Sequence, residues 1–165
     1  MKLELMELKR MHPLLPESTA AEYGHRAALG LERHRHESGV VLKSRFHRGS
    51  REDTLHWVGS APGDLDQLDR HRITEDAAEA IALAFVRMSL GWVVRRRLQR
   101  GEFADWLLRD AEAGLVALEV SGVDYDGDYD RLRIKIEQVR RATAAAERAA
   151  CVIELSGPRA IMATA

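Results

Sequence analysis

The sequence has a single cysteine, few aromatic residues and almost no net charge. Cys151 stands alone, which excludes an internal disulfide and any CxxC zinc site. A formal charge of −1 at pH 7 argues against a protein that coats nucleic acid by bulk charge, although it leaves room for a local basic groove. Because only 5% of the chain is aromatic while 45% is hydrophobic, the core is expected to pack small aliphatic side chains.

Long apolar runs and several well-known motifs are also missing. No window approaches the roughly 18 apolar residues of a membrane-spanning helix. The N-terminal MKLELMELKR lacks the apolar centre of a signal peptide. These absences predict a cytoplasmic protein without a membrane partner. The chain also contains no GxxxxGK[ST], GxGxxG or GxSxG, which argues against a nucleotide-binding loop and a serine hydrolase.

Apolar periodicity and turn residues divide the chain into an N-terminal extension and a larger core. In the extension, the expected elements are a strand within residues 1–12, a helix at 19–35, and a β-hairpin with strands 40–46 and 53–59. The segment SAPGD at 60–64 has the composition of a linker. A boundary at this linker gives two predicted domains, residues 1–62 and residues 63–165.

The core reads as helix, three strands, helix and strand. Thr74 followed by Glu75 and Asp76 indicates a helix start, because a capping hydroxyl and acidic residues favour the positive end of the helix dipole. The expected elements are helices at 74–90 and 128–148, strands at 92–98, 103–109, 115–122 and 151–155, and an edge strand at 160–165. Three meandering strands, a crossover helix and a fourth strand favour an α+β fold, with a central mixed β-sheet flanked by helices.

Two carboxylates lie inside the apolar runs of the second and third core strands. Side chains alternate along a strand, so Glu119 and Ser121 share one face of residues 115–122. Asp105 lies beside Glu119 if the register of the hairpin permits it. Two buried carboxylates repel one another, and a divalent cation removes that cost. Because Mg²⁺ is usually held by one or two carboxylates, the pair predicts a Mg²⁺ or Mn²⁺ site.

This order of elements, with one acid on the second strand and another on the third, resembles the core of the PD-(D/E)xK nuclease superfamily over about residues 74–157. The superfamily includes restriction endonucleases and archaeal-type Holliday junction resolvases. The resemblance implies a restriction-endonuclease-like αβββαβ core, Mg²⁺-dependent cleavage of DNA and a homodimer, since cutting a duplex needs two sites. It also implies Asp105 and Glu119 as metal ligands, joined by Glu79 or Glu75 from the first core helix.

The third motif residue departs from the family pattern. The family lysine, which is implied to orient or activate the attacking water, stands two residues after the glutamate, where this chain has Ser121. Lys135 on the following helix is the expected replacement, with Arg131 and Gln138 on the same side of that helix. The resemblance thus implies catalysis by Asp105, Glu119 and Lys135, and substrate binding by Ser121, Arg131, Gln138 and Arg97.

Asp105 and Glu119 could instead be present only to form structural ion pairs. Asp105 can form an ion pair with Arg96 or Arg97, and Glu119 can form one with Arg131 or Lys135. The serine in place of the motif lysine and the near-neutral charge favour an alternative function. In that alternative the chain is a degenerate nuclease-fold subunit, which binds a protein partner in a bacterial nucleic-acid-processing or defence complex. A third possibility is a nucleic-acid-binding protein without catalysis.

Overall fold

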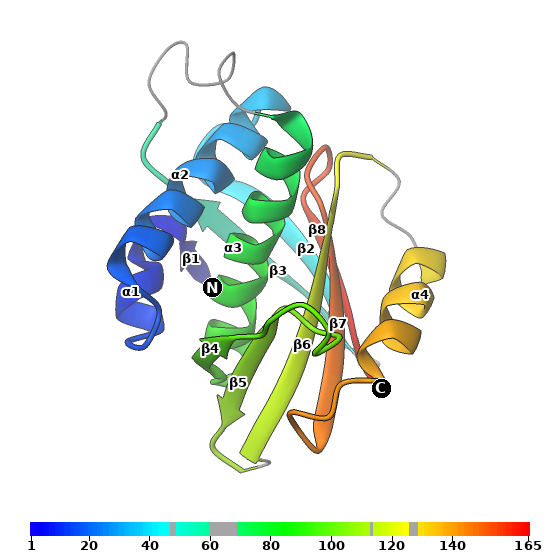
Figure 1. The fold of residues 1–165 in the computed structure, drawn as a ribbon. Coiled ribbons are helices and arrows are strands. Elements are labelled where there is room, and N and C mark those ends of the chain that lie inside the picture. Colours follow the sequence, from blue (N-terminus) through cyan, green and yellow to red (C-terminus); the bar gives the residue numbers. More distant parts are fainter. Residues whose placement is uncertain (47–48, 60–68, 113, 126–128) are drawn as a thin grey trace.

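The centre of the molecule is a mixed eight-stranded β-sheet with helices on its faces (Figure 1). The computed structural model describes residues 1–46, 49–59, 69–112, 114–125 and 129–165. The strand order is β1-β3-β2-β8-β7-β6-β5-β4. This arrangement confirms the predicted α+β class.

The bounds of the elements follow the predicted order with some changes of length. The strands are β1 (Lys2–Glu4), β2 (Val40–Phe46), β3 (Gly49–His56), β4 (Val93–Arg97), β5 (Trp106–Asp110), β6 (Gly114–Val123), β7 (Glu147–Glu154) and β8 (Arg159–Thr164). The helices are η1 (Leu5–Glu7), α1 (Leu8–Met11), α2 (Glu17–Arg33), α3 (Arg70–Leu90) and α4 (Tyr129–Val139). In the part of the chain that the structure describes, none of these helices combines the length and the apolar character needed to cross a lipid bilayer.

The N-terminal segment and the core contribute to the same sheet. β2 pairs antiparallel with β3 and parallel with β8, which brings Ser44 opposite Ala160. β1 extends this edge by pairing in parallel with β3. The boundary predicted between residues 62 and 63 lies outside the described residues, and strands from both sides of it are hydrogen-bonded neighbours.

The predicted succession of helix, three strands, helix and strand is present as α3, β4, β5, β6, α4 and β7. β4, β5 and β6 form an antiparallel meander. β6 then pairs in parallel with β7, and α4 makes the connection that a parallel pair requires. α3 begins at Arg70 rather than at Thr74, because the side chain of Asp69 caps it by accepting a hydrogen bond of 2.9 Å from the backbone N–H of His71.

Side-chain alternation along β6 separates the core into two layers. Val116, Leu118 and Val120 belong to the larger cluster of buried residues, which includes the apolar face of α3. Ala117 points the other way and packs in a second cluster with Leu132 of α4. α2 and α3 therefore lie on one face of the sheet and α4 on the other (Figure 1).

A glycine allows α3 to lie very close to β6. A Cβ atom placed on Gly122 would be 2.4 Å from the carbonyl oxygen of Thr74 and 2.9 Å from the Cβ of Ala78. The first distance is far shorter than any van der Waals contact, so a side chain at this position would force the two elements apart. The contact fixes the position of β6, and hence of Glu119, relative to α3.

Several predicted elements differ in extent from the observed ones. The helix predicted over residues 128–148 ends at Val139, and β7 begins at Glu147, earlier than the predicted strand 151–155. Arg148 stabilises the intervening loop, because its guanidinium donates to the carbonyl oxygens of Ala142 at 2.7 Å and Ala146 at 3.2 Å. The strand predicted within residues 1–12 is limited to Lys2–Glu4 and is followed by η1 and α1.

Candidate functional site

The two acidic residues singled out in the sequence lie side by side, Asp105 directly before β5 and Glu119 within β6. Trp106 pairs with Leu118 and Leu107 with Ala117, so the antiparallel register places Asp105 opposite Glu119. The backbone N–H of Asp105 donates to Leu118 O at 3.0 Å, and its Oδ2 accepts from the backbone N–H of Val120 at 2.8 Å. Asp105 is therefore bound to the residues on either side of Glu119, which keeps the two carboxyl groups close together.

Burial and mutual repulsion make this pair of carboxyl groups hard to ionise. The pKa of Glu119 is raised from an ordinary 4.5 to about 7, first by burial and then by the negative charge of Asp105. Burial also raises the pKa of Asp105, although the hydrogen bond from Val120 and the positive charge of Lys135 oppose that shift. Near neutral pH the pair consequently retains a proton for part of the time, and a nearby cation would release it.

α4 supplies a cation and an amide to Glu119. The Nζ of Lys135 lies 2.6 Å from Glu119 Oε1, and the Nε2 of Gln138 donates to the same oxygen at 2.8 Å. Lys135 also donates to Gln138 Oε1 at 3.3 Å. The spacing of three residues puts Lys135 and Gln138 on the same side of the helix, as the sequence predicts. The replacement lysine therefore reaches the carboxylate pair.

Arg131 and Ser121 form a second contact between α4 and β6. The Nε of Arg131 donates to Ser121 Oγ at 2.8 Å. Ser121 lies two residues beyond Glu119 on the strand, so both side chains are on the face covered by α4. The guanidinium of Arg131 therefore lies next to Ser121, the position at which the family pattern has its lysine.

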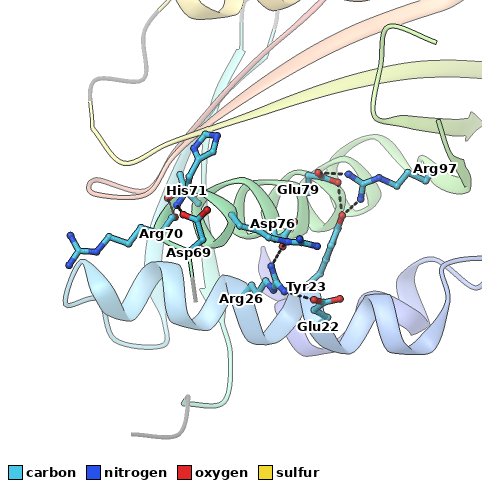
Figure 2. Close-up of polar contacts among 11 residues, drawn as sticks. Glu22, Tyr23, Arg26, Asp69, Arg70, His71, Asp76, Glu79 and Arg97 are labelled. Carbon is cyan, nitrogen blue, oxygen red and sulfur yellow. Dashed lines mark hydrogen bonds and ion pairs between the residues drawn. The ribbon is translucent and has the colours of Figure 1, made fainter. Parts of the chain in front are cut away.

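Glu79, the predicted third metal ligand, is instead held by protein donors. Its Oε2 accepts from Tyr23 Oη and from Trp106 Nε1, each at 2.8 Å, and its Oε1 accepts from Arg97 Nη2 at 2.9 Å. Figure 2 shows Tyr23 and Arg97 pointing at this carboxylate from α2 and β4. Burial, followed by the charge of Asp105, raises the pKa of Glu79 to about 7.

Arg97, which the sequence predicts to bind substrate, has a structural partner as well. Besides its bond to Glu79, its guanidinium lies over the ring of Trp106, 5.2 Å from the ring centroid. Farther along α3, towards its N-terminus, Arg26 of α2 binds Asp76 and also contacts Glu22 (Figure 2). These hydrogen bonds and ion pairs link α2, α3 and β4 to one another beside the carboxylate pair.

The carboxylate pair opens into a small polar pocket. Its volume is about 180 Å³, and its charged lining residues are Glu75, Glu79, Arg97, Asp105, Glu119, Arg131 and Lys135. Glu75, the alternative third acid, is the most exposed of these acids and forms a pair with His71 at 3.2 Å. The pocket thus presents Asp105 and Glu119 at the sheet, two further acids from α3, and basic groups from β4 and α4. Such a lining suits an anionic ligand that arrives together with a cation.

The donors in this pocket fit a magnesium ion better than a transition metal. Within the described residues, no group of three or more His, Cys, Asp or Glu side chains is arranged to hold a metal ion. Mg²⁺ needs only one or two carboxylates, because water and substrate phosphate complete its shell. Asp105 and Glu119 meet that requirement. The hydrogen bonds that already occupy both oxygens of Glu79 speak against it as a third ligand.

The structural ion pairs considered for these residues are present only in part. Arg96 binds Glu102 with both guanidinium nitrogens, at 2.9 and 2.7 Å, rather than Asp105. Glu119, in contrast, does pair with Lys135.

The sequence did not predict Tyr23 and the indole of Trp106 as partners of Glu79. A tryptophan directly after Asp105 was the one available signal, since alternation turns its side chain to the α3 face.

Comparison with known proteins adds no family assignment to this geometry. No protein-family model matches the chain, and neither a curated protein nor a solved structure is significantly similar to it.

Proposed function

We propose that this protein is a Mg²⁺-dependent phosphodiesterase that cleaves DNA. One observation carries the proposal: the half-buried Asp105, directly before β5, lies opposite the buried Glu119 of β6, and an ammonium group lies 2.6 Å from Glu119. Burying two like charges destabilises a fold, so their retention side by side is more readily explained by binding of a cation than by stability. The PD-(D/E)xK resemblance of the sequence supplies the reaction class.

Asp105 and Glu119 would hold the metal ion through their carboxylate oxygens. When bound, Mg²⁺ polarises the phosphate and makes water a better nucleophile at neutral pH. The backbone N–H of Val120 fixes Asp105 Oδ2 at 2.8 Å, and Gln138 fixes Glu119 Oε1 at 2.8 Å, so both side chains are oriented in advance. This preorganisation avoids rearranging the ligands during the reaction.

Lys135 would position the attacking water or contact a phosphate oxygen. Its ammonium group has three donors, of which two are directed at Glu119 and Gln138, so one is left for a substrate or water. Arg131, whose Nε donates to Ser121 Oγ at 2.8 Å, would bind the phosphate, because a guanidinium matches the geometry of phosphate oxygens. Cations from α4 thereby take over the role that the family assigns to a lysine at position 121.

A second candidate function has one observation in its favour. Lys135, Gln138 and Glu119 satisfy one another's hydrogen bonds, as a purely structural ion pair would. In that case the chain is a catalytically inactive subunit, and a protein partner replaces the nucleic acid. The two functions differ in their metal requirement, which makes them separable in one assay.

Relaxation of a supercoiled plasmid in Mg²⁺ or Mn²⁺ tests the proposal. We expect the wild type to nick the plasmid and Glu119→Gln, which keeps the shape of the side chain, to lose this activity. Glu112→Gln is the matched control, because Glu112 is exposed in the β5–β6 turn. If none of the proteins cuts with either cation and calorimetry detects no metal binding, the inactive-subunit function replaces the nuclease.

A further inference from the structure

Phe103 is an aromatic residue held out towards solvent in an unfavourable backbone conformation. Its φ angle is +60°, in the left-handed region that large L side chains rarely adopt, and 43% of its surface is exposed. It lies two residues before Asp105 in the connection between β4 and β5. An exposed ring kept in a strained conformation so close to a candidate site suggests that the ring has a function.

Two adjoining surface depressions link Phe103 to the carboxylate pair. The first, of about 400 Å³, is lined by Arg97, Arg100, Phe103, Asp105, Glu119 and Gln138 among others. The second, of about 510 Å³, is lined by Phe103 together with residues of α4. Phe103 and Gln138 belong to both, so a continuous groove runs from the carboxylates, past the ring and along the helix.

The groove combines positive charge with a small apolar platform. Arg133 and Arg141 line its outer part and Arg100 its inner part, while Glu137 is paired with Arg140 at 2.5 Å. Ile134, which is 60% exposed, adds an apolar surface next to Phe103. Grooves that bind single-stranded nucleic acid are built this way, with cations along the backbone path and an aromatic ring under a base.

We propose that this groove binds an unpaired nucleotide of the substrate, with its base stacked on Phe103 and the adjoining phosphates contacted by Arg100, Arg133 and Arg141. The inference rests on the proposed phosphodiesterase and specifies its substrate class: a single strand or an unpaired end beside a duplex. The bases of an intact duplex have their faces covered by neighbouring base pairs, so they offer nothing for Phe103 to stack on.

Fluorescence anisotropy with a labelled oligo(dT) and a blunt duplex of equal length tests the inference. Both are titrated in EDTA, so that binding is read without cleavage. We expect the wild type to prefer the single strand and Phe103→Ala to weaken that binding by about five- to 150-fold, the range for loss of one stacked base. Phe103→Trp retains the preference. Leu115→Ala, which removes a residue of similar exposure (41%) from β6, leaves binding unchanged.

A salt titration adds a readout that is independent of the ring. Arg141→Gln lowers the slope of log K against log salt by about 0.7 if that side chain contacts one phosphate of a single strand. Equal affinity of the wild type and Phe103→Ala for oligo(dT), or tighter binding of the wild type to the blunt duplex, overturns the inference. Cleavage of the supercoiled plasmid and of the same oligo(dT) in Mg²⁺ is scored separately. A protein that cleaves but ignores Phe103 refutes only this groove, and one that binds through Phe103 without cleaving either DNA refutes only the nuclease.

Discussion

Replacing Asp105 by asparagine is expected to stabilise the protein while removing its response to magnesium. The amide keeps an oxygen that can accept the hydrogen bond from Val120, which Asp105 accepts at 2.8 Å. It removes the negative charge that raises the pKa values of both Glu119 and Glu79. A residue that serves only stability would behave in the opposite way, because its loss would lower the melting temperature.

The size of the stabilisation follows from the pKa of Glu119. The rise in the pKa of Glu119 from 4.5 to about 7 corresponds to a cost of about 3 kcal/mol for ionising this carboxyl group in the folded state. Burial is the larger cause and repulsion by Asp105 the second, so the part removed by Asp105→Asn is about 1 kcal/mol. For a chain of 165 residues, that raises Tm by about 2–4 °C.

Magnesium should stabilise the wild type by a comparable amount. At a free concentration about ten times Kd, binding to the folded state alone adds about 1.4 kcal/mol, or about 3–6 °C in Tm. Asp105→Asn lacks one of the two carboxylates and should show a shift near zero. Glu112→Gln, which changes an exposed carboxylate, should respond like the wild type.

Differential scanning fluorimetry at pH 8, with EDTA or with increasing Mg²⁺, measures both effects on the same samples. Sodium chloride at equal ionic strength separates binding at the pair from general screening of charge, because screening affects all three proteins equally. A variant that melts below the wild type in EDTA, or that keeps the full magnesium shift, would refute the reasoning.

Three further outcomes follow from the same contacts. The pKa values of Glu119 and Glu79 in the folded state, about 7, exceed the ordinary 4.5, so the unfolded chain loses these protons first as the pH rises. The free energy of unfolding, measured by urea denaturation in EDTA, should therefore fall between about pH 4.5 and 7. Gly122→Ala should destabilise the fold by about 1–3 kcal/mol, because the added Cβ overpacks against α3. Gly157→Ala should not, because its Cβ would be 3.8 Å from the nearest atom. The midpoints of urea unfolding of the two variants measure the difference. Lys135→Met should slow plasmid nicking about 100-fold or more while Lys135→Arg retains part of the rate, and equal rates would make the lysine structural.

The carboxylate pair could be predicted from sequence because its geometry is local. Asp105 directly precedes β5 and Glu119 lies in β6, and one short turn joins these strands, so an antiparallel register suffices to bring the two residues together. Lys135 was predictable for a similar reason, since its spacing from Gln138 defines a helix face. The surroundings of Glu79 were not predictable, because Tyr23, Arg97 and Trp106 reach it from three separate elements.

The end of α4 could not be predicted for a different physical reason. Residues 142–146 are rich in alanine, which has the highest helix propensity, so the local preference favours a longer helix. Tertiary contacts override this preference. The parallel pairing of β7 with β6 starts at Glu147 opposite Val116, and Arg148 binds the carbonyl groups of the preceding loop. A buried parallel strand has no alternation that would mark its beginning in the sequence.

The most direct test of the central claim is the anomalous difference density of a crystal soaked in Mn²⁺. The account predicts one strong peak between the carboxylates of Asp105 and Glu119, at the distances of metal–oxygen bonds, with Lys135 within reach of a water on the ion. A crystal that shows Glu119 still bound to Lys135 and Gln138, with manganese elsewhere or not bound, would contradict it.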